Sequence, residues 1–298
     1  MRTWLKWTAG GVVVVLGLAA AGVVAGLQLA ERKRMRQVSV KVEPLAYTSD
    51  AQALARGRYL FESRGCAECH GVTGGGQEFV NDGKGTRLVA PNITSRGVVA
   101  SYQPQDWVRT IRHGVKPDGR PVLVMPSEDY NRFTDDDVAA VVAYARSLPP
   151  QPGPGPTVEL PLPAWVLYGY GAIPDAASRI DHTLAPAQPV PEGATALHGR
   201  YVANMCIGCH GESLSGGRIP GGPPDWPPAA NLTPGEGSAL ARYQDVHAFK
   251  AMLHSGRRPD GTTIRVMPFA SLAKLSEVDV QALYLFLKTL PPRPVGQH

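Results

Sequence analysis

The longest apolar stretch of the chain lies close to its first residue. Residues 8–30 contain a single strongly polar side chain, Gln28, and basic residues precede them. A helix of this length can cross the hydrocarbon core of a bilayer, so the pattern predicts a membrane-spanning helix and tether in residues 1–44. The apolar part of a cleaved signal peptide is usually about 7 to 15 residues long. The length therefore favours an uncleaved anchor, while small residues at 19–21 leave cleavage open as an alternative.

Helical spacing of apolar residues returns several times farther along the chain, between loops rich in glycine and proline. Residues 51–61 follow Asp50, which is a suitable N-cap. Residues 104–113 begin with a proline, which is tolerated in the first turn of a helix. Thr134 and the acids after it cap a helix that reaches Leu148. These patterns predict an all-α protein.

A proline-rich block divides the rest of the chain. Residues 149–191 hold eleven prolines and few charges, so they are predicted to be extended and fairly stiff. The middle of the block, residues 164–168, is too apolar for a free linker and is expected to lie against one or both domains. We predict an anchor and tether, a first domain, a linker and a second domain in residues 1–44, 45–150, 151–190 and 191–298.

The two predicted domains are copies of each other. Residues 107–150 align without a gap on residues 249–292 at an offset of 142. Pro-Asp-Gly, Val-Met-Pro and Leu-Pro-Pro occur at matching places in both segments. A Gly-Arg-Tyr sequence at Gly57 recurs at Gly199 with the same offset of 142. Internal repetition of this kind indicates two units of one fold.

Each copy carries a Cys-x-x-Cys-His sequence, and the two copies together use all four cysteines. This motif is the attachment signature of c-type haem: two thiols bind the porphyrin and the adjacent histidine binds the iron. A four-cysteine zinc site usually has its pairs about 15 to 20 residues apart, whereas 136 residues separate Cys69 from Cys206. A thioredoxin-like dithiol has no use for the histidine. The motifs predict two covalently bound haems c, attached through Cys66, Cys69, Cys206 and Cys209 and ligated by His70 and His210.

The second iron ligand is predicted from the repeat. Met125 and Met267 both stand in Val-Met-Pro, 59 and 61 residues after the first cysteine of their motifs. Methionine is usually a packing residue, but the matched positions favour axial ligation by both. His113 and His254 are rivals that do not align with each other, and Met252 is interpreted as a core residue. His182, His198, His247 and His298 have no partner in the repeat and are expected to have ordinary roles.

The net charge of +5 is concentrated at the start of the chain. Residues 1–41 hold seven Lys and Arg residues against one Glu, so the remainder is slightly negative. Nucleic-acid binding is therefore excluded.

The chain resembles the class I cytochrome c domains of the cytochrome subunits of membrane-bound alcohol and gluconate dehydrogenases. The resemblance rests on the Gly-Arg-Tyr sequences, the Cys-x-x-Cys-His motifs, the Asn-Ile-Thr and Asn-Leu-Thr segments at 92–94 and 231–233, and the Met-Pro pairs. It implies a small helical fold in which Gly57 and Gly199 let the first helix cross closely over the last, with Tyr144 and Phe286 at the crossing. This chain has two haem domains where those subunits have three.

We therefore predict a membrane-anchored dihaem cytochrome c that transfers electrons and is not itself an enzyme. Its donor would be a periplasmic dehydrogenase subunit, and its acceptor a terminal oxidase or another cytochrome. The main alternative is a dihaem enzyme such as a peroxidase, which needs an open iron. A thiosulfate-oxidising enzyme would need an additional cysteine, and a haem sensor would need an output domain.

The predicted location is the bacterial inner membrane, with both haem domains in the periplasm, where haem is attached to this motif. The basic residues at 32–36 outnumber those before the helix, and the positive-inside rule would place them in the cytoplasm. The haem motif outweighs that conflicting signal.

Overall fold

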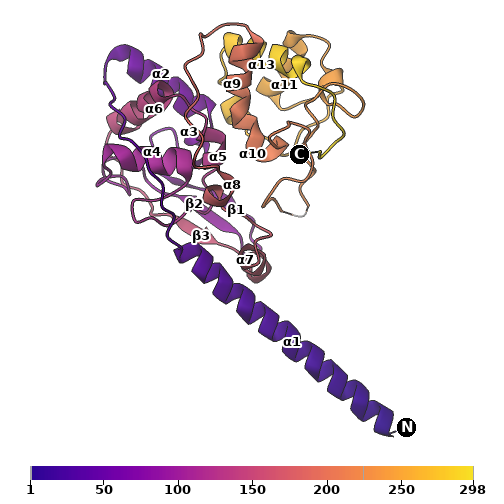
Figure 1. Cartoon of the computed structure of the whole chain (residues 1–298). Helices are drawn as coiled ribbons and strands as arrows, with labels where there is room; N and C mark the ends of the chain where they lie inside the picture. Colours follow the sequence, from indigo (N-terminus) through magenta and orange to yellow (C-terminus); the bar gives the residue numbers. More distant parts are fainter. Residues whose placement is uncertain (1, 224, 298) are drawn as a thin grey trace.

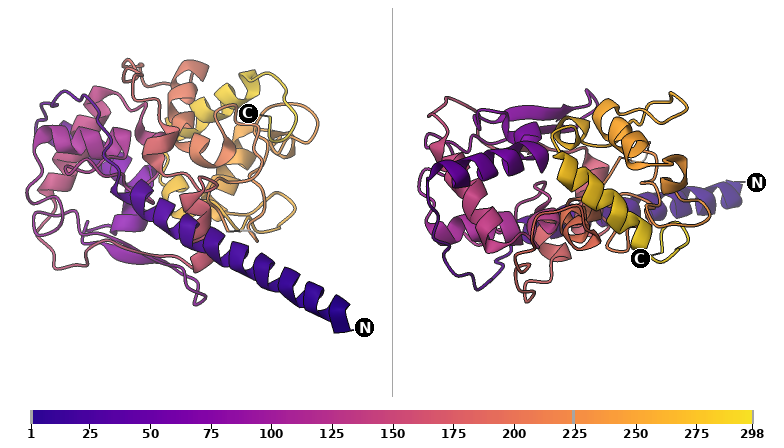
Figure 2. Two further views of the ribbon diagram at one scale, coloured as in Figure 1. Left: turned by 60° about the horizontal axis from the view of Figure 1, so that its bottom comes forward. Right: turned by 90° about the horizontal axis from the view of Figure 1, so that it is seen from above.

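The computed structural model describes residues 2–223 and 225–297, which form one long helix and a helical globular part (Figure 1). α1 (Arg2–Met35) projects from the globular part as a rod, and its N-terminal end extends beyond the globular part in both views of Figure 2. Its segment Lys6–Met35 is long and apolar enough to cross a membrane. The prediction for His298 lies outside the described residues.

The first half of the globular part is built on the crossing of α2 (Ala51–Ser63) with α6 (Asp135–Ser147). Both helices have the predicted caps: the side chains of Asp50 and Thr134 each accept a hydrogen bond from the backbone N–H three residues on. A core of buried apolar side chains, including Leu60, fills the space beside the crossing. The other helices of this half are α3 (Cys66–His70), α4 (Pro104–His113) and α5 (Ser127–Tyr130).

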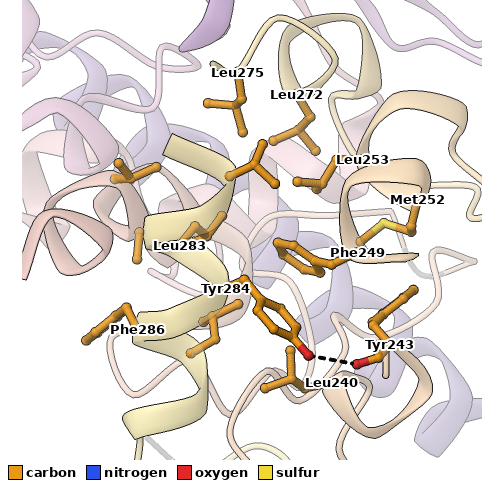
Figure 3. Packing of buried hydrophobic residues seen from close by; sticks show 14 of the residues in the cluster. Leu240, Tyr243, Phe249, Met252, Leu253, Leu272, Leu275, Leu283, Tyr284 and Phe286 are labelled. Carbon is orange, nitrogen blue, oxygen red and sulfur yellow. Dashed lines mark hydrogen bonds between the residues drawn. The ribbon is translucent and has the colours of Figure 1, made fainter. Parts of the chain in front are cut away.

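The second half repeats this arrangement, with α9 (Ala196–Val202) crossing α13 (Glu277–Thr289). Figure 3 shows its core, in which Phe249 and Tyr284 pack together and the Tyr284 hydroxyl donates to the Tyr243 carbonyl at 3.1 Å. Met252 is buried in this core, as predicted. The remaining helices of this half are η1 (Ala203–Cys206), α10 (Ile207–His210), η2 (Leu240–Arg242), α11 (Val246–Ser255) and α12 (Phe269–Leu272).

The prediction of an all-α protein was wrong in one respect, because a small antiparallel sheet lies beside the first half. β1 (Gln77–Asn81) pairs with β2 (Arg87–Ala90), and β2 pairs with β3 (Thr157–Glu159). The third strand comes from the proline-rich block, so the sheet joins segments far apart in the sequence. Strands this short carry too few alternating positions to give a periodic signal.

The proline-rich block is less extended than predicted. Besides β3 it contains α7 (Leu162–Gly169) and α8 (Ala176–Arg179). Pro161 and Pro163 occupy the cap and first turn of α7, where the missing N–H has no helical partner to lose. The apolar stretch at 164–168 packs against α1, a contact that we had not predicted.

Candidate haem-attachment sites

Each Cys-x-x-Cys-His motif forms a short helix directly after the first long helix of its half. In the first half, Gly65 has φ +88°, a left-handed conformation that suits glycine and lets the chain turn sharply from α2 into α3. The Tyr130 hydroxyl donates to the Arg64 carbonyl at 2.9 Å and holds that turn. In the second half, η1 connects α9 to α10 without a glycine. Thus α3 and α10 occupy equivalent places.

The histidines of both motifs are oriented in the same way. His70 Nδ1 lies 2.8 Å from the Pro91 carbonyl oxygen, and His210 Nδ1 lies 2.8 Å from the Ala230 carbonyl oxygen. Because a carbonyl only accepts, Nδ1 carries the proton and donates, which leaves the Nε2 lone pair free. Burial lowers the pKa of both rings and keeps them neutral. A neutral imidazole with a carbonyl on its other nitrogen is the usual form of a metal-binding histidine.

The cysteines are unsuited to redox or nucleophilic chemistry as thiols. All four are unpaired, so neither motif forms a disulfide. Desolvation by the surrounding protein raises the pKa of the Cys66 and Cys206 thiols to about 12. Reactive dithiols have lowered pKa values, so this direction disfavours a thioredoxin-like role. Two protonated thiols beside a neutral, oriented imidazole fit the donor set for covalent haem.

The two candidate methionines are placed by the same backbone turn. After each comes a proline with almost the same dihedral angles, φ −80° and ψ 65° at Pro126 and φ −80° and ψ 66° at Pro268. The next N–H donates back to the methionine carbonyl at 2.9 Å in both halves. Met125 and Met267 are partly buried, each packed against the core of its own half. Their axial ligation stays a prediction.

Asn92 and Asn231 fold the loops that follow the motifs. Asn92 Oδ1 accepts from the backbone N–H and the hydroxyl of Thr94, both at 2.8 Å, and its Nδ2 donates to the Gln151 carbonyl at 2.6 Å. Asn231 makes the same contacts with Thr233, at 2.9 and 2.7 Å, and donates to the Arg293 carbonyl at 2.7 Å. Both asparagines therefore form turns and tie the end of each half to its loop.

The two halves meet through crossed contacts that the sequence did not indicate. Asp129 in α5 accepts a hydrogen bond at 2.7 Å from the Gly208 N–H of α10. Glu68 in α3 accepts one at 2.7 Å from the Ser271 N–H of α12. Each motif helix thus touches the helix that follows the Met-Pro pair of the other half. The two motifs therefore face the same interface.

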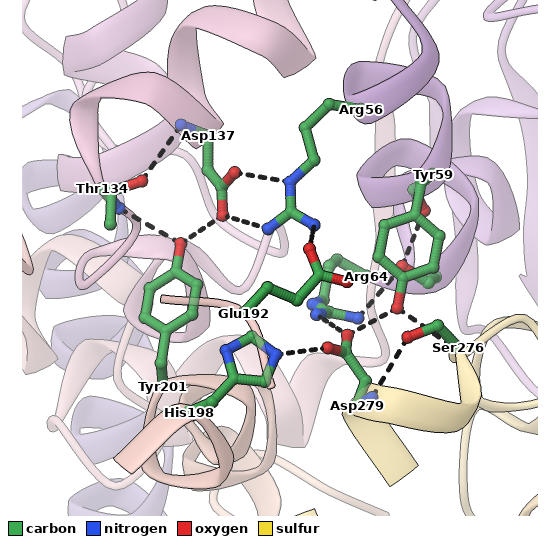
Figure 4. A network of polar contacts seen from close by, with 11 residues as sticks. Arg56, Tyr59, Arg64, Thr134, Asp137, Glu192, His198, Tyr201, Ser276 and Asp279 are labelled. Atoms are coloured by element: carbon green, nitrogen blue, oxygen red, sulfur yellow. Dashed lines mark hydrogen bonds and ion pairs between the residues drawn. The ribbon is translucent and has the colours of Figure 1, made fainter. Parts of the chain in front are cut away.

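A polar network lies farther along this interface (Figure 4). The Tyr59 hydroxyl donates to Asp279 of the second half at 2.5 Å, and the Tyr201 hydroxyl donates to Asp137 of the first half at 2.6 Å. Both pairs are related by the repeat offset of 142. These tyrosines belong to the Gly-Arg-Tyr sequences that recur in both halves, and we predicted no role for them. Their recurrence with the two aspartates was the signal that could have revealed them.

The Asp279 carboxylate accepts hydrogen bonds from three different side chains. Burial opposes its ionisation, but the Arg64 guanidinium at 2.6 Å and hydrogen bonds from Tyr59 and His198 outweigh that cost and lower its pKa. His198, which was expected to be ordinary, donates from Nε2 to the carboxylate at 2.7 Å. Because Arg64 and Asp279 come from different halves, the ion pair joins them.

Comparison with known proteins agrees with this geometry. Residues 52–144 match the family described as cytochrome c oxidase, cbb3-type, subunit III. The chain is 26% identical over 284 residues to the fructose dehydrogenase cytochrome subunit of Gluconobacter japonicus, covering 84% of this chain and 55% of that protein. It is 26% identical over 277 residues to the gluconate 2-dehydrogenase cytochrome c subunit of Pantoea cypripedii, covering 81% of this chain and 60% of the relative.

Another relative is more similar to this chain, but over a shorter stretch. Over 114 residues the chain is 32% identical to the cbb3-type cytochrome c oxidase subunit CcoP of Helicobacter pylori (strain 52), covering 38% of this chain and 34% of that subunit. The chain spans little more than half the length of the fructose and gluconate dehydrogenase subunits named above. Together with the oriented histidines and cysteine pairs, these similarities relate residues 52–144 to a cytochrome c domain and most of the chain to the cytochrome subunits of dehydrogenases.

Proposed function

We propose that this protein is a membrane-anchored dihaem cytochrome that carries electrons between partner proteins. Cys66, Cys69, Cys206 and Cys209 would attach two haems c, in domains at residues 45–150 and 191–298. When bound, each haem supplies an iron that alternates between Fe(II) and Fe(III). The observation that carries the proposal is the identical setting of His70 and His210, each held by a backbone carbonyl with Nε2 free.

Each iron would be bound by two residues of the chain, which would leave no position open to a substrate. His70 and Met125 would serve the first haem, and His210 and Met267 the second, through Nε2 and the thioether sulfur. A histidine–methionine pair raises the reduction potential and suits electron transfer. The apolar cores beside both methionines would keep water away from each iron. The surroundings would therefore reorganise little when the iron changes its oxidation state.

The crossed contacts support transfer between the two sites. The Asp129–Gly208 and Glu68–Ser271 hydrogen bonds bring both motif helices to one interface. The Tyr59–Asp279 and Tyr201–Asp137 bonds then fix the orientation of the halves. The interface would hold the two attachment sites at a constant separation, as a relay requires.

The partners follow from the relatives and from α1. The relatives' names describe cytochrome subunits of dehydrogenases and of a cytochrome c oxidase. We infer a periplasmic dehydrogenase as donor and a terminal oxidase or another cytochrome as acceptor. α1 would span the bacterial inner membrane and leave both haem domains in the periplasm. The chain itself would carry electrons and leave the substrate chemistry to its donor.

Haem counting and near-infrared spectroscopy together test this function. A pyridine haemochrome assay on the purified full chain should give two haems per polypeptide. The oxidised protein should show the near-infrared methionine-to-iron band with the intensity of two sites. Two haems with one such band would favour a dihaem enzyme such as a peroxidase. Two haems with no band would rule out both methionine ligands.

A further inference from the structure

The segment between Glu159 and Asp175 contains no charged residue, although it belongs to the part of the chain outside α1. It contains α7, and its aromatic residues are Trp165, Tyr168 and Tyr170. Tryptophan and tyrosine are enriched where a protein meets the interface between lipid and water. An uncharged segment with this composition is unusual in a connection between two soluble domains.

α7 packs against α1 with almost no space between the two backbones. A Cβ on Gly169 would lie 2.0 Å from the Gly26 carbonyl oxygen, and a Cβ on Gly26 would lie 2.9 Å from Val166 Cγ1. The Tyr170 hydroxyl donates to the Gly22 carbonyl at 2.7 Å. Close crossing at small residues is typical of helices that pack inside membranes.

The contacts place α7 beside the apolar part of α1. Gly22 and Gly26 both lie within the apolar stretch at 8–30. At about 1.5 Å per residue, Gly22 lies on the order of 16 Å along the helix from Lys33. If α1 spans the membrane, the end of α7 that carries Tyr170 is at the depth of lipid, because it touches α1 there.

Charged groups lie where the contact between α1 and α7 approaches the globular part. Lys33 Nζ donates to the carbonyls of Tyr168 and Ile173, at 3.2 and 3.1 Å, and lies 4.4 Å from the centre of the Tyr168 ring. The guanidinium of Arg36 donates to both carboxylate oxygens of Asp175 at 2.6 Å. These groups form a polar layer between the apolar contact and the globular part.

α7 also carries apolar side chains that remain exposed. Leu162 and Leu167 are 54% and 47% exposed, and Tyr170, whose hydroxyl contacts α1, is still 55% exposed. The apolar surface of α1 is also exposed, and Val15 on it is 65% exposed. Lipid that surrounds α1 would therefore also cover α7.

We propose that α7 is a second membrane-contacting element, which lies in the lipid interface beside α1 on the side of the haem domains. The inference rests on the proposed role of α1 as a membrane span. With α1 alone the globular part could rotate about a single attachment. Two attachments at an angle would fix its height and orientation above the membrane.

Nitroxide labels on single introduced cysteines test the proposal in the haem-loaded full chain, reconstituted alone into phospholipid nanodiscs. Native cysteines bound to haem do not react with the label, and the unsubstituted protein should give no signal. Leu167→Cys and Leu162→Cys report on α7, and Val15→Cys reports on α1. Leu197→Cys is the aqueous control, because Leu197 is 61% exposed and lies in α9, away from α1 (Figure 1). Each variant must retain two haems.

The readout is the relaxation of each label by oxygen, which concentrates in lipid, and by a water-soluble nickel chelate. Labels at 167 and 162 should give an oxygen-to-nickel ratio severalfold above that at 197 and no higher than that at 15. If 167 and 162 match 197 while 15 stays in lipid, the inference is wrong and the span stands. If 15 itself is aqueous, the proposed span fails. Labels at 167 and 162 shielded from both relaxants would mean that protein covers α7, which also overturns the inference.

Discussion

At the scale of single residues, two glycines permit the helix crossings that shape both halves. A Cβ on Gly57 would lie 2.0 Å from the Ala140 carbonyl oxygen and 2.7 Å from Tyr144 Cβ. At Gly199 the corresponding distance to the Ala282 carbonyl oxygen is 1.9 Å. The obstacle in each case is backbone, which cannot move aside as a flexible side chain can. The crossing predicted from the sequence, with Tyr144 and its repeat partner beside it, is confirmed.

Gly57→Ala should therefore destabilise the first half strongly. The helices must separate to accept the methyl group, which also loosens the packing of Leu60, and the expected loss in the free energy of unfolding is about 3 kcal/mol. Gly155→Ala is the matched control, since a Cβ there meets no described atom within 4 Å. Urea unfolding followed by circular dichroism measures both variants. Equal stability of the two would contradict the crossing.

The axial assignment of the methionines is also a question of single residues. Met125→Leu keeps the apolar volume near the core and removes the thioether, so the near-infrared band should fall by about half while the haem content stays at two. Met252→Leu is the control, because Met252 is buried in the second core and should leave the band unchanged. A full band in the Met125 variant would exclude this methionine as a ligand.

At the scale of elements, α8 attaches the proline-rich block to the first half through a pair of histidines. His113 at the end of α4 and His182 just beyond α8 bring their Nδ1 atoms within 3.0 Å, so one ring donates and the other accepts. His182 Nε2 lies 3.0 Å from the Ala177 carbonyl. Burial, then the neighbouring His182 and the nearby Arg112 and Arg109, lowers the pKa of His113 to about 4.

The attachment of α8 to the first half through this histidine pair should weaken as the pH falls. The pKa of His113 is about 4 in the folded protein and about 6.5 when unfolded, so its contribution is fully present above about pH 6.5 and lost as the pH falls toward 4. After allowance for solvent screening, the effect is on the order of 1 kcal/mol. Thermal melts at pH 7 and pH 5 measure it. His113→Gln should reduce the pH dependence, whereas His254→Gln, on the exposed side of α11, should leave it unchanged.

The elements also indicate what the sequence could predict. Some features act on the backbone next to them, such as the caps at Asp50 and Thr134 and the proline that starts α4. Their effects could therefore be predicted from the neighbouring sequence. The Cys-x-x-Cys-His motifs were readable because haem attachment demands adjacent residues. The sheet, the histidine pair at His113 and the crossed contact at Asp129 join residues distant in sequence. Such pairings have no period and depend on the completed fold.

At the scale of the whole molecule, the repeat relates the contacts between the halves as well as the halves themselves. Tyr59 reaches Asp279 just as Tyr201 reaches Asp137, and each tyrosine oxygen also accepts a backbone N–H, from Ser276 at 3.1 Å and from Thr134 at 3.2 Å. An interface of this kind uses the same patch twice, as in a symmetric dimer. The linked halves therefore behave as a dimer within one chain.

The double variant Tyr59→Phe, Tyr201→Phe tests whether this interface sets the relation between the two proposed haems. Each change removes a hydrogen bond to a buried carboxylate, which costs about 1.5–3 kcal/mol, while the core of each half is untouched. We expect separate unfolding transitions for the two halves and an altered spacing between the two reduction potentials in a redox titration. Tyr144→Phe is the control, because the Tyr144 hydroxyl makes no hydrogen bond among the described residues. A lower melting temperature with unchanged potentials would mean that the tyrosines stabilise the chain without positioning the haems.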